Sequence, residues 1–324
     1  MTPTRRPDNQ PEAPTPRRKD FAMKSLRTPD EQFVDPPGYP FTPHYVEIDD
    51  LDGGTLRVHY LDEGPADGPV VLAMHGEPSW SYLHRKMIPL LTGAGLRVIA
   101  PDLVGFGKSD KPSEKSDYTY ERHVGWMQAA IVDHLDLHDT TFFGQDWGGL
   151  VGLRLVAENP DRFARVIVGN TGLPIGEGSP SKAFLQWQQF SQESPVFPIG
   201  QLLNSATLTE LSNDEIAAYD APFPDETFKE GARIFPSLVP TSLDDPAVPA
   251  NQAAWNVFTM WDKPFITCFS DSDPITAGGD APFLKLVPGA QGQPHVTIEN
   301  AHHFFQEDGA PQIAQVIIDA VARG

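Results

Sequence analysis

Cysteine is nearly absent from this chain of 324 residues, which contains only Cys268. A single cysteine excludes an intramolecular disulfide framework, and it excludes a metal site built from several thiolates. The residues around Cys268 predict a buried strand. A chain without disulfides fits a reducing compartment, so we expect a cytoplasmic protein.

Long hydrophobic runs are missing as well. Hydrophobic residues make up 40% of the chain, the mean hydropathy is −0.32, and no uninterrupted apolar run approaches the roughly 18 residues that cross a bilayer. We therefore expect a soluble protein that does not enter a membrane.

Positive charge is scarce. The chain has 24 Lys and Arg residues against 44 Asp and Glu residues, a formal net charge of −20. Such an acidic surface argues against binding to nucleic acid or to anionic membranes. It favours a substrate that is neutral, or at least not polyanionic.

The beginning of the chain differs from the remainder. Its first 20 residues contain five prolines, five Lys or Arg and three Asp or Glu. They have no apolar segment of the kind found in a secretory signal, and their composition is typical of disorder. We predict a disordered extension over residues 1–22.

A regular alternation of strands and helices begins near Pro43 and is typical of a mostly parallel sheet with helices on both faces. Ligands of such sheets bind at the carboxyl ends of the strands. The predicted strands are residues 45–48, 55–61, 69–74, 96–100, 140–145, 162–169, 265–269 and 295–299. A helix capped by Ser79 is expected to extend to about Thr92.

The alternation is interrupted after Asn170. Residues 171–243 are polar, proline-rich and aromatic, with short helical stretches such as 181–191 and 212–219 and no clear strand. We predict a helical cap domain over residues 171–243, inserted into a core domain formed by residues 23–170 and 244–324.

The most informative stretch is Gly144-Gln145-Asp146-Trp147-Gly148, at a predicted strand-to-helix junction. It has the form of a nucleophile elbow, in which flanking glycines allow a sharp turn and hold the middle residue in a strained conformation. Here that residue is Asp146. A carboxylate needs no base to activate it, so the elbow suits displacement at carbon followed by hydrolysis of the ester. The five-residue pattern alone also fits an ordinary glycine-rich turn.

An elbow of this kind is followed along the chain by an acid and then a histidine, each in a loop after a strand. After the last predicted strand we choose His303 as the base, with His302 as the alternative. After the strand at residues 265–269 we choose Asp273 as the acid, with Asp271 as the alternative.

Three motifs together resemble those of the haloalkane dehalogenases, members of the α/β-hydrolase superfamily. They are residues 75–80 (His-Gly-Glu-Pro-Ser-Trp), residues 144–149 (Gly-Gln-Asp-Trp-Gly-Gly) and residues 301–307 (Ala-His-His-Phe-Phe-Gln-Glu). The resemblance covers the chain from about Met23 and is closest to the subfamily with Glu after His-Gly and a late acid. It implies an α/β-hydrolase fold with an eight-stranded, mostly parallel sheet.

The resemblance also assigns further roles. It implies that two tryptophans donate their indole N–H groups to the departing halide, that two backbone N–H groups form an oxyanion hole, and that apolar side chains line the pocket. It implies a small apolar halogenated substrate and a halide product, with no cofactor and no metal. We expect a monomer or weak oligomer. The residues are Trp147 and Trp187 for the halide, Glu77 and Trp147 for the oxyanion hole, and Phe184, Phe223, Pro224 and Ile275 for the pocket.

Other functions remain open at this stage. An epoxide hydrolase has the same fold but resembles a family with two cap tyrosines, whereas Tyr219 is the only tyrosine after Leu150. A fluoroacetate dehalogenase resembles a family with Asp-Arg-Gly at the elbow, where this chain has Asp-Trp-Gly. A binding protein without catalytic activity is a further alternative, since fold does not determine function.

Overall fold

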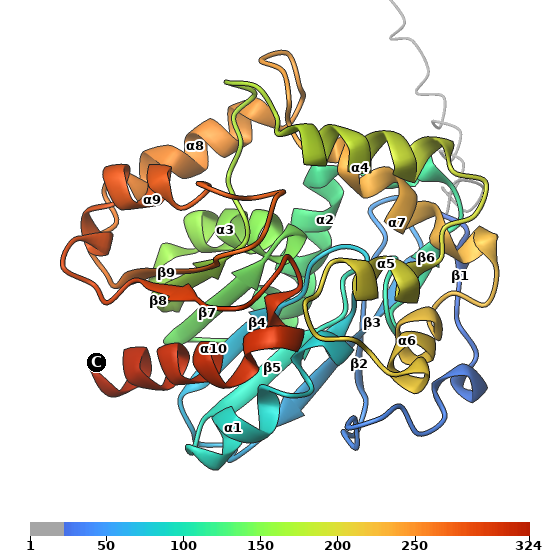
Figure 1. The fold of residues 1–324 in the computed structure, drawn as a ribbon, viewed down its shortest axis with the longest axis horizontal. Helices are drawn as coiled ribbons and strands as arrows, with labels where there is room; N and C mark the ends of the chain where they lie inside the picture. Colours follow the sequence, from blue (N-terminus) through green and yellow to red (C-terminus); the bar gives the residue numbers. More distant parts are fainter. Residues whose placement is uncertain (1–22) are drawn as a thin grey trace, which may run out of the picture.

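The computed structural model describes residues 23–324, so the expected extension over residues 1–22 lies outside the described residues. An eight-stranded sheet runs through the molecule in the order β10-β9-β8-β7-β4-β5-β3-β2 (Figure 1). Two neighbouring pairs of strands are antiparallel, β2 with β3 and β3 with β5. All other neighbouring strands of this sheet are parallel. The strands are β2 (His44–Asp49), β3 (Thr55–Glu63), β4 (Val70–Met74), β5 (Arg97–Pro101), β7 (Thr140–Gln145), β8 (Phe163–Gly169), β9 (Phe265–Ser270) and β10 (Val296–Ile298).

Helices cover both faces of this sheet. Helices α2, α3 and α8 contact one another on one face, and α1 contacts α10 on the other (Figure 1). All six residues of the central strand β7 are buried, as expected for a parallel strand covered on both sides. The α/β fold predicted from the sequence is confirmed. The helices are α1 (Ile88–Gly93), α2 (Tyr120–Met127), α3 (Trp147–Glu158), α8 (Val248–Phe258), α9 (Ala281–Leu286) and α10 (Phe305–Ala322).

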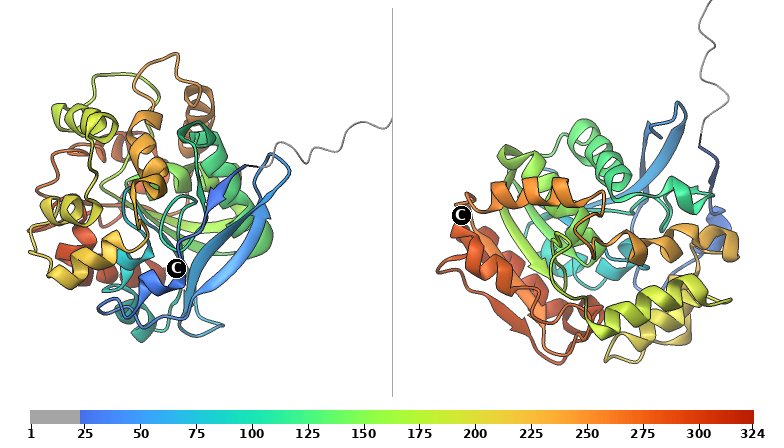
Figure 2. Two further views of the ribbon diagram at one scale, coloured as in Figure 1. Left: turned by 90° about the vertical axis from the view of Figure 1, so that its right-hand side faces the viewer. Right: turned by 90° about the horizontal axis from the view of Figure 1, so that it is seen from above.

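The chain between β8 and α8 is helical, and within the described residues it contributes no strand to the sheet. Figure 2 shows these helices gathered on one side of the molecule, beside the sheet. The start of α6 has a capping box, in which Ser212 and Glu215 each bond to the other's backbone N–H. The helices are α4 (Lys182–Glu193), α5 (Ile199–Ser205), α6 (Asn213–Asp220) and α7 (Glu230–Ile234).

One predicted helix is wrong. The sequence favoured a single helix from Ser79 to Thr92, but the structure has a 3-10 turn, η2 (Ser81–His84), followed by the separate helix α1. Ser79 donates its hydroxyl to the Gly76 carbonyl at 2.7 Å and so caps no helix. Pro89 occupies the first turn of α1, because proline is tolerated only where the backbone N–H is not needed.

A small two-stranded sheet ties the start of the described chain to the core. Strand β1 (Ser25–Leu26) pairs antiparallel with β6 (Lys111–Pro112). Next to it, Arg27 donates from Nε and Nη2 to the two carboxylate oxygens of Asp110, at 2.7 and 2.8 Å. Strands of two residues carry no periodic pattern, so sequence reasoning did not find them.

Candidate active site

Asp146 lies between the last residue of β7 and the first residue of α3, with φ 49° and ψ −125°. A positive φ is strained for a residue with a side chain, and surrounding contacts have to hold it. The Asp146 N–H donates to the Asn170 carbonyl at 3.0 Å, and the Thr171 hydroxyl donates to the Asp146 carbonyl at 2.7 Å. The elbow therefore presents its carboxylate at the carboxyl edge of the sheet.

Two glycines allow other parts of the backbone to approach this turn. A Cβ atom on Gly148 would lie 2.2 Å from the Met74 carbonyl oxygen, and one on Gly76 would lie 2.5 Å from the Asp146 Cβ. Both distances are below any possible van der Waals contact. Glycine is thus required for the loop after β4 to pack against the elbow.

His303 lies between two carboxylates. Its Nε2 atom is 3.6 Å from Oδ2 of Asp146, and its Nδ1 atom is 3.0 Å from Oδ2 of Asp273. The Asp273 carboxylate is oriented by the Ile275 N–H at 2.8 Å and by the Thr276 hydroxyl. The structure thus brings together the residues expected as nucleophile, base and acid, with His303 in contact with both carboxylates.

Electrostatics favour an ion pair within this line. Burial alone would lower the pKa of His303, but the charge of Asp273 and the bonds to both carboxylates outweigh burial and raise it well above the ordinary value. For Asp273, burial opposes ionisation, yet the charge and hydrogen bond of His303 hold the pKa of that carboxyl well below its usual range. The two carboxylates therefore favour the protonated form of His303.

The alternative acid and histidine lie elsewhere. Asp271 is exposed, and its carboxylate accepts from the Asn300 and Ala301 N–H groups at 2.9 and 3.2 Å. Its role is to close the loop that carries His303. His302 instead donates its backbone N–H to Asp308 at 2.9 Å.

The first expected oxyanion donor contacts the nucleophile directly. The Glu77 N–H donates to Oδ1 of Asp146 at 2.8 Å. The second, the Trp147 N–H, belongs to the first residue of α3, where helical N–H groups are free to bind an anion.

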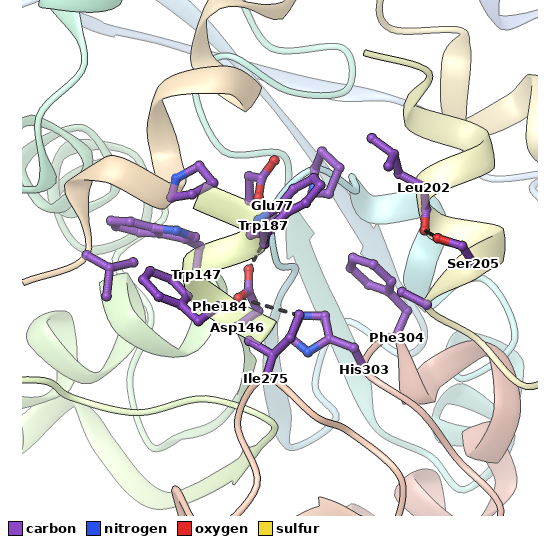
Figure 3. Close-up of a pocket in the computed structure, with 14 residues that line it drawn as sticks. Glu77, Asp146, Trp147, Phe184, Trp187, Leu202, Ser205, Ile275, His303 and Phe304 are labelled. Carbon is purple, nitrogen blue, oxygen red and sulfur yellow. Dashed lines mark hydrogen bonds and ion pairs between the residues drawn. The ribbon is translucent and has the colours of Figure 1, made fainter. Parts of the chain in front are cut away.

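A cavity of about 200 Å³ opens over Asp146, and its wall is mostly apolar (Figure 3). It brings together the nucleophile, the base, both expected halide-binding tryptophans and two of the expected pocket residues. Its lining consists of Glu77, Pro78, Asp146, Trp147, Phe184, Trp187, Leu202, Ser205, Ala206, Pro236, Val239, Ile275, His303 and Phe304.

The structure does not bring the other two expected pocket residues, Phe223 and Pro224, into this cavity. Pro224 is exposed, and Phe223 is buried against the ring of Phe106, with a ring separation of 6.4 Å. The preceding carbonyl, of Pro222, accepts a 2.6 Å bond from Thr28. Because this segment is tied to the start of the chain, it packs away from the cavity.

Sequence reasoning also missed residues that hold the site together. The Asn170 amide donates to the carbonyls of His302 and His303, both at 3.0 Å. Gln145 donates to the His303 carbonyl at 3.2 Å. Both directly follow or end a central strand, which is the signal that could have identified them.

A second and larger hollow, of about 550 Å³, adjoins the first. It is lined mainly by the loop before α4 (residues 171–181), by residues 239–241 and by the loop after Asp273. Four residues line both hollows and form the neck between them: Asp146, Phe184, Val239 and Ile275.

Within residues 23–324, no group of three or more His, Cys, Asp or Glu side chains is arranged to hold a metal ion. No helix in the described part of the chain is long and apolar enough to cross a membrane.

Comparisons with known proteins agree with this geometry. The family model of the alpha/beta hydrolase fold matches residues 69–310. The chain is 60% identical to a haloalkane dehalogenase of Psychrobacter cryohalolentis over 92% of this chain and 98% of the relative. It is 54% identical to haloalkane dehalogenase 1 of Mycobacterium tuberculosis, over 90% and 97%.

Solved structures give the same result. The haloalkane dehalogenase of Paraglaciecola agarilytica, described as tetrameric, superposes with a TM-score of 0.83 at 38% identity, covering 93% of this chain and 98% of that chain. The resemblance inferred from the three sequence motifs is confirmed. The chain belongs to the haloalkane dehalogenase family, within the α/β-hydrolase fold.

Proposed function

We propose that this protein hydrolyses haloalkanes to an alcohol, a halide ion and a proton, through a covalent alkyl ester on Asp146. One observation carries the proposal: His303 lies between Asp146 and Asp273, at 3.6 and 3.0 Å, on the floor of a mostly apolar cavity. Relatives named haloalkane dehalogenase at 51 to 60% identity support the net reaction.

In the first step, an Asp146 oxygen attacks the carbon that bears the halogen. The new C–O bond forms as the C–halogen bond breaks, and the halide leaves with the bonding electrons. Trp147 and Trp187 both line the cavity. Their indole N–H groups are donors only, which suits an anion in an apolar pocket.

In the second step, His303 takes a proton from a water molecule that attacks the ester carbonyl. Esterification removes the charge of Asp146, one of the two carboxylates that raise the pKa of His303. The imidazole then loses its proton more readily and becomes a competent base. Formation of the ester in the first step therefore prepares His303 to act as the base in the second step.

The tetrahedral intermediate of the second step places negative charge on the carbonyl oxygen of the ester, which comes from the Asp146 carboxylate. The Glu77 N–H already donates to Oδ1 at 2.8 Å, and the Trp147 N–H is the second donor. Each such donor contributes about 2.7–4 kcal/mol to lowering the barrier in comparable enzymes. Collapse of the intermediate releases the alcohol and regenerates Asp146.

Different segments of the chain supply different parts of the proposed site. Residues 23–170 and 244–324 supply the nucleophile, the acid and the base, and residues 171–243 supply Trp187 and much of the cavity wall. We infer that the latter act as a cap domain. Since one chain supplies the whole proposed site, a monomer or weak oligomer suffices for the reaction, and light scattering on the purified protein distinguishes this from a tetramer.

An epoxide hydrolase is disfavoured by one contact. Such a reaction needs acidic groups that protonate an alkoxide, but the hydroxyl of Tyr219 is buried and donates to Glu307. Tyr219 does not line the cavity. The cavity therefore offers an anion two indole donors and offers an alkoxide no tyrosine.

Halide release tests the proposed reaction. The purified protein is mixed with 1-bromobutane and, separately, with styrene oxide, beside an Asp146→Ala control. Bromide and acid from the wild type alone, with the epoxide unchanged, support the dehalogenase. Diol from the epoxide without bromide from 1-bromobutane overturns it.

A further inference from the structure

The Glu77 side chain is not explained by the steps above, which use only its backbone. Glu77 is 4% exposed, and its Oε1 atom has no hydrogen-bond partner among the described residues. The carboxyl's side-chain contact is with the Trp187 indole, and an ionised carboxylate buried with so few partners would cost several kcal/mol. The carboxyl lies in the wall of the cavity, close to Trp187 (Figure 3).

Two charged groups face this carboxyl from the core. Asp146 faces it from the elbow, and His303 faces it from the loop after β10; from the cap it meets the indole of Trp187, which does not titrate. Asp146 has to be ionised in order to attack. A second carboxylate beside it would repel both the nucleophile and the departing halide.

We propose that Glu77 works as a neutral carboxylic acid whose O–H lies beside the Trp147 and Trp187 indoles and donates a third hydrogen bond to the departing halide. The proposal rests on the halide chemistry proposed above. It assigns the glutamate of the His-Gly-Glu motif to the first step, as a donor, in addition to the backbone role in the second step.

The electrostatics of the site agree. Burial raises the pKa of Glu77 well above its ordinary value, and the charge of Asp146 raises it further, while Trp187 and His303 act in the opposite direction. A raised pKa means that the neutral form persists into a pH range where an exposed glutamate is ionised. The donor is lost as pH rises through the raised pKa, so halide affinity falls in that direction.

The test is bromide binding measured by quenching of tryptophan fluorescence, from about pH 6 to about pH 10, in wild type, Glu77→Gln and Glu77→Leu. Gln keeps a neutral donor of similar shape, and Leu removes it. We expect Gln to bind bromide like the wild type at low pH and with a flatter pH dependence. Leu should bind about tenfold more weakly, the effect of one lost hydrogen bond.

Turnover provides a second readout. If Glu77 acts as a neutral donor, kcat of the Gln variant for 1-bromobutane should depend less on pH on the alkaline side than kcat of the wild type, because an amide does not ionise there. A Gln variant that is inactive with a wild-type pH dependence of bromide binding overturns the proposal, as does a Leu variant that binds bromide as well as Gln. Thermal unfolding identifies variants that fail to fold. Bromide binding can be measured without turnover. Failure of the proposed dehalogenase reaction would therefore be seen separately, as a wild type that releases no bromide from 1-bromobutane.

Discussion

The guanidinium of Arg85 and the carboxylate of Glu307 form a buried ion pair that joins three parts of the molecule. Glu307 has no exposed side-chain surface and also binds Lys86 at 2.7 Å. Arg85 reaches Glu215 of the cap helix α6 at 2.6 Å, and Tyr219 of the same helix donates to Glu307. The cap is thereby fixed to the helix that follows His303.

Removal of Glu307 should destabilise the protein strongly. Glu307→Ala removes the buried partner of Arg85 and leaves it only the partly exposed Glu215. Loss of a buried partner costs about 3–5 kcal/mol, and chemical denaturation measures the loss. The half-exposed pair Arg97 and Asp62, at 2.6 Å, provides the control, because Asp62→Ala should cost no more than about 1 kcal/mol. Equal effects of the two substitutions would contradict a special role of the buried pair.

The strained backbone of Asp146 predicts that a glycine variant at this position is more stable than an alanine variant, the reverse of the usual order. At φ 49°, alanine carries a steric penalty of about 1–2 kcal/mol that glycine does not. Asp146→Gly should therefore melt at a higher temperature than Asp146→Ala, although both are inactive. The comparison uses thermal unfolding, and a more stable alanine variant would show that the turn is relaxed.

The titration of His303 should depend on Asp146. If both carboxylates raise the pKa of His303, then Asp146→Asn, which resembles the ester in charge, should lower that pKa relative to the wild type. NMR of the His303 ring measures the shift directly. The variant loses stabilisation of the imidazolium, so its neutral form appears at lower pH. An unchanged pKa would mean that alkylation does not switch on the base.

The width of the neck between the two hollows should determine how well long substrates react compared with short ones. Val239 lines both hollows, so Val239→Phe should slow long bromoalkanes, whose tails extend into the outer hollow, more than bromoethane. Leu243 belongs to the same segment and is 65% exposed, which makes Leu243→Phe the matched control. The measurement is kcat/KM across a chain-length series; a uniform loss at every length would contradict passage of the tail through the neck.

The core of the fold was predictable because its signals are local. Buried parallel strands are continuous apolar runs, and the elbow requires glycines at fixed positions around Asp146. The positions of Asp273 and His303 follow from strand order, since parallel strands bring the loops at their carboxyl ends to one edge. Eight strands and the three motifs were therefore visible in the residues themselves.

The cap resisted prediction because its arrangement depends on contacts distant in sequence. Phe223 was expected in the pocket, but the bond from Thr28 to the carbonyl of Pro222 spans 194 residues and holds the segment elsewhere. Asn170 directly follows the predicted strand at residues 162–169, but no motif assigned it a role. Its contacts to the His303 loop, 133 residues away, exist only in the folded protein.

The central claim is the covalent ester on Asp146, and trapping it tests the claim most directly. His303→Phe should complete the first step and stop, because no base remains to activate water. After incubation with 1-bromobutane, intact-mass and peptide mass spectrometry should show one butyl group on Asp146 per chain, with release of a matching amount of bromide. Continued turnover by the variant, or bromide release without a butyl group on Asp146, would contradict the mechanism.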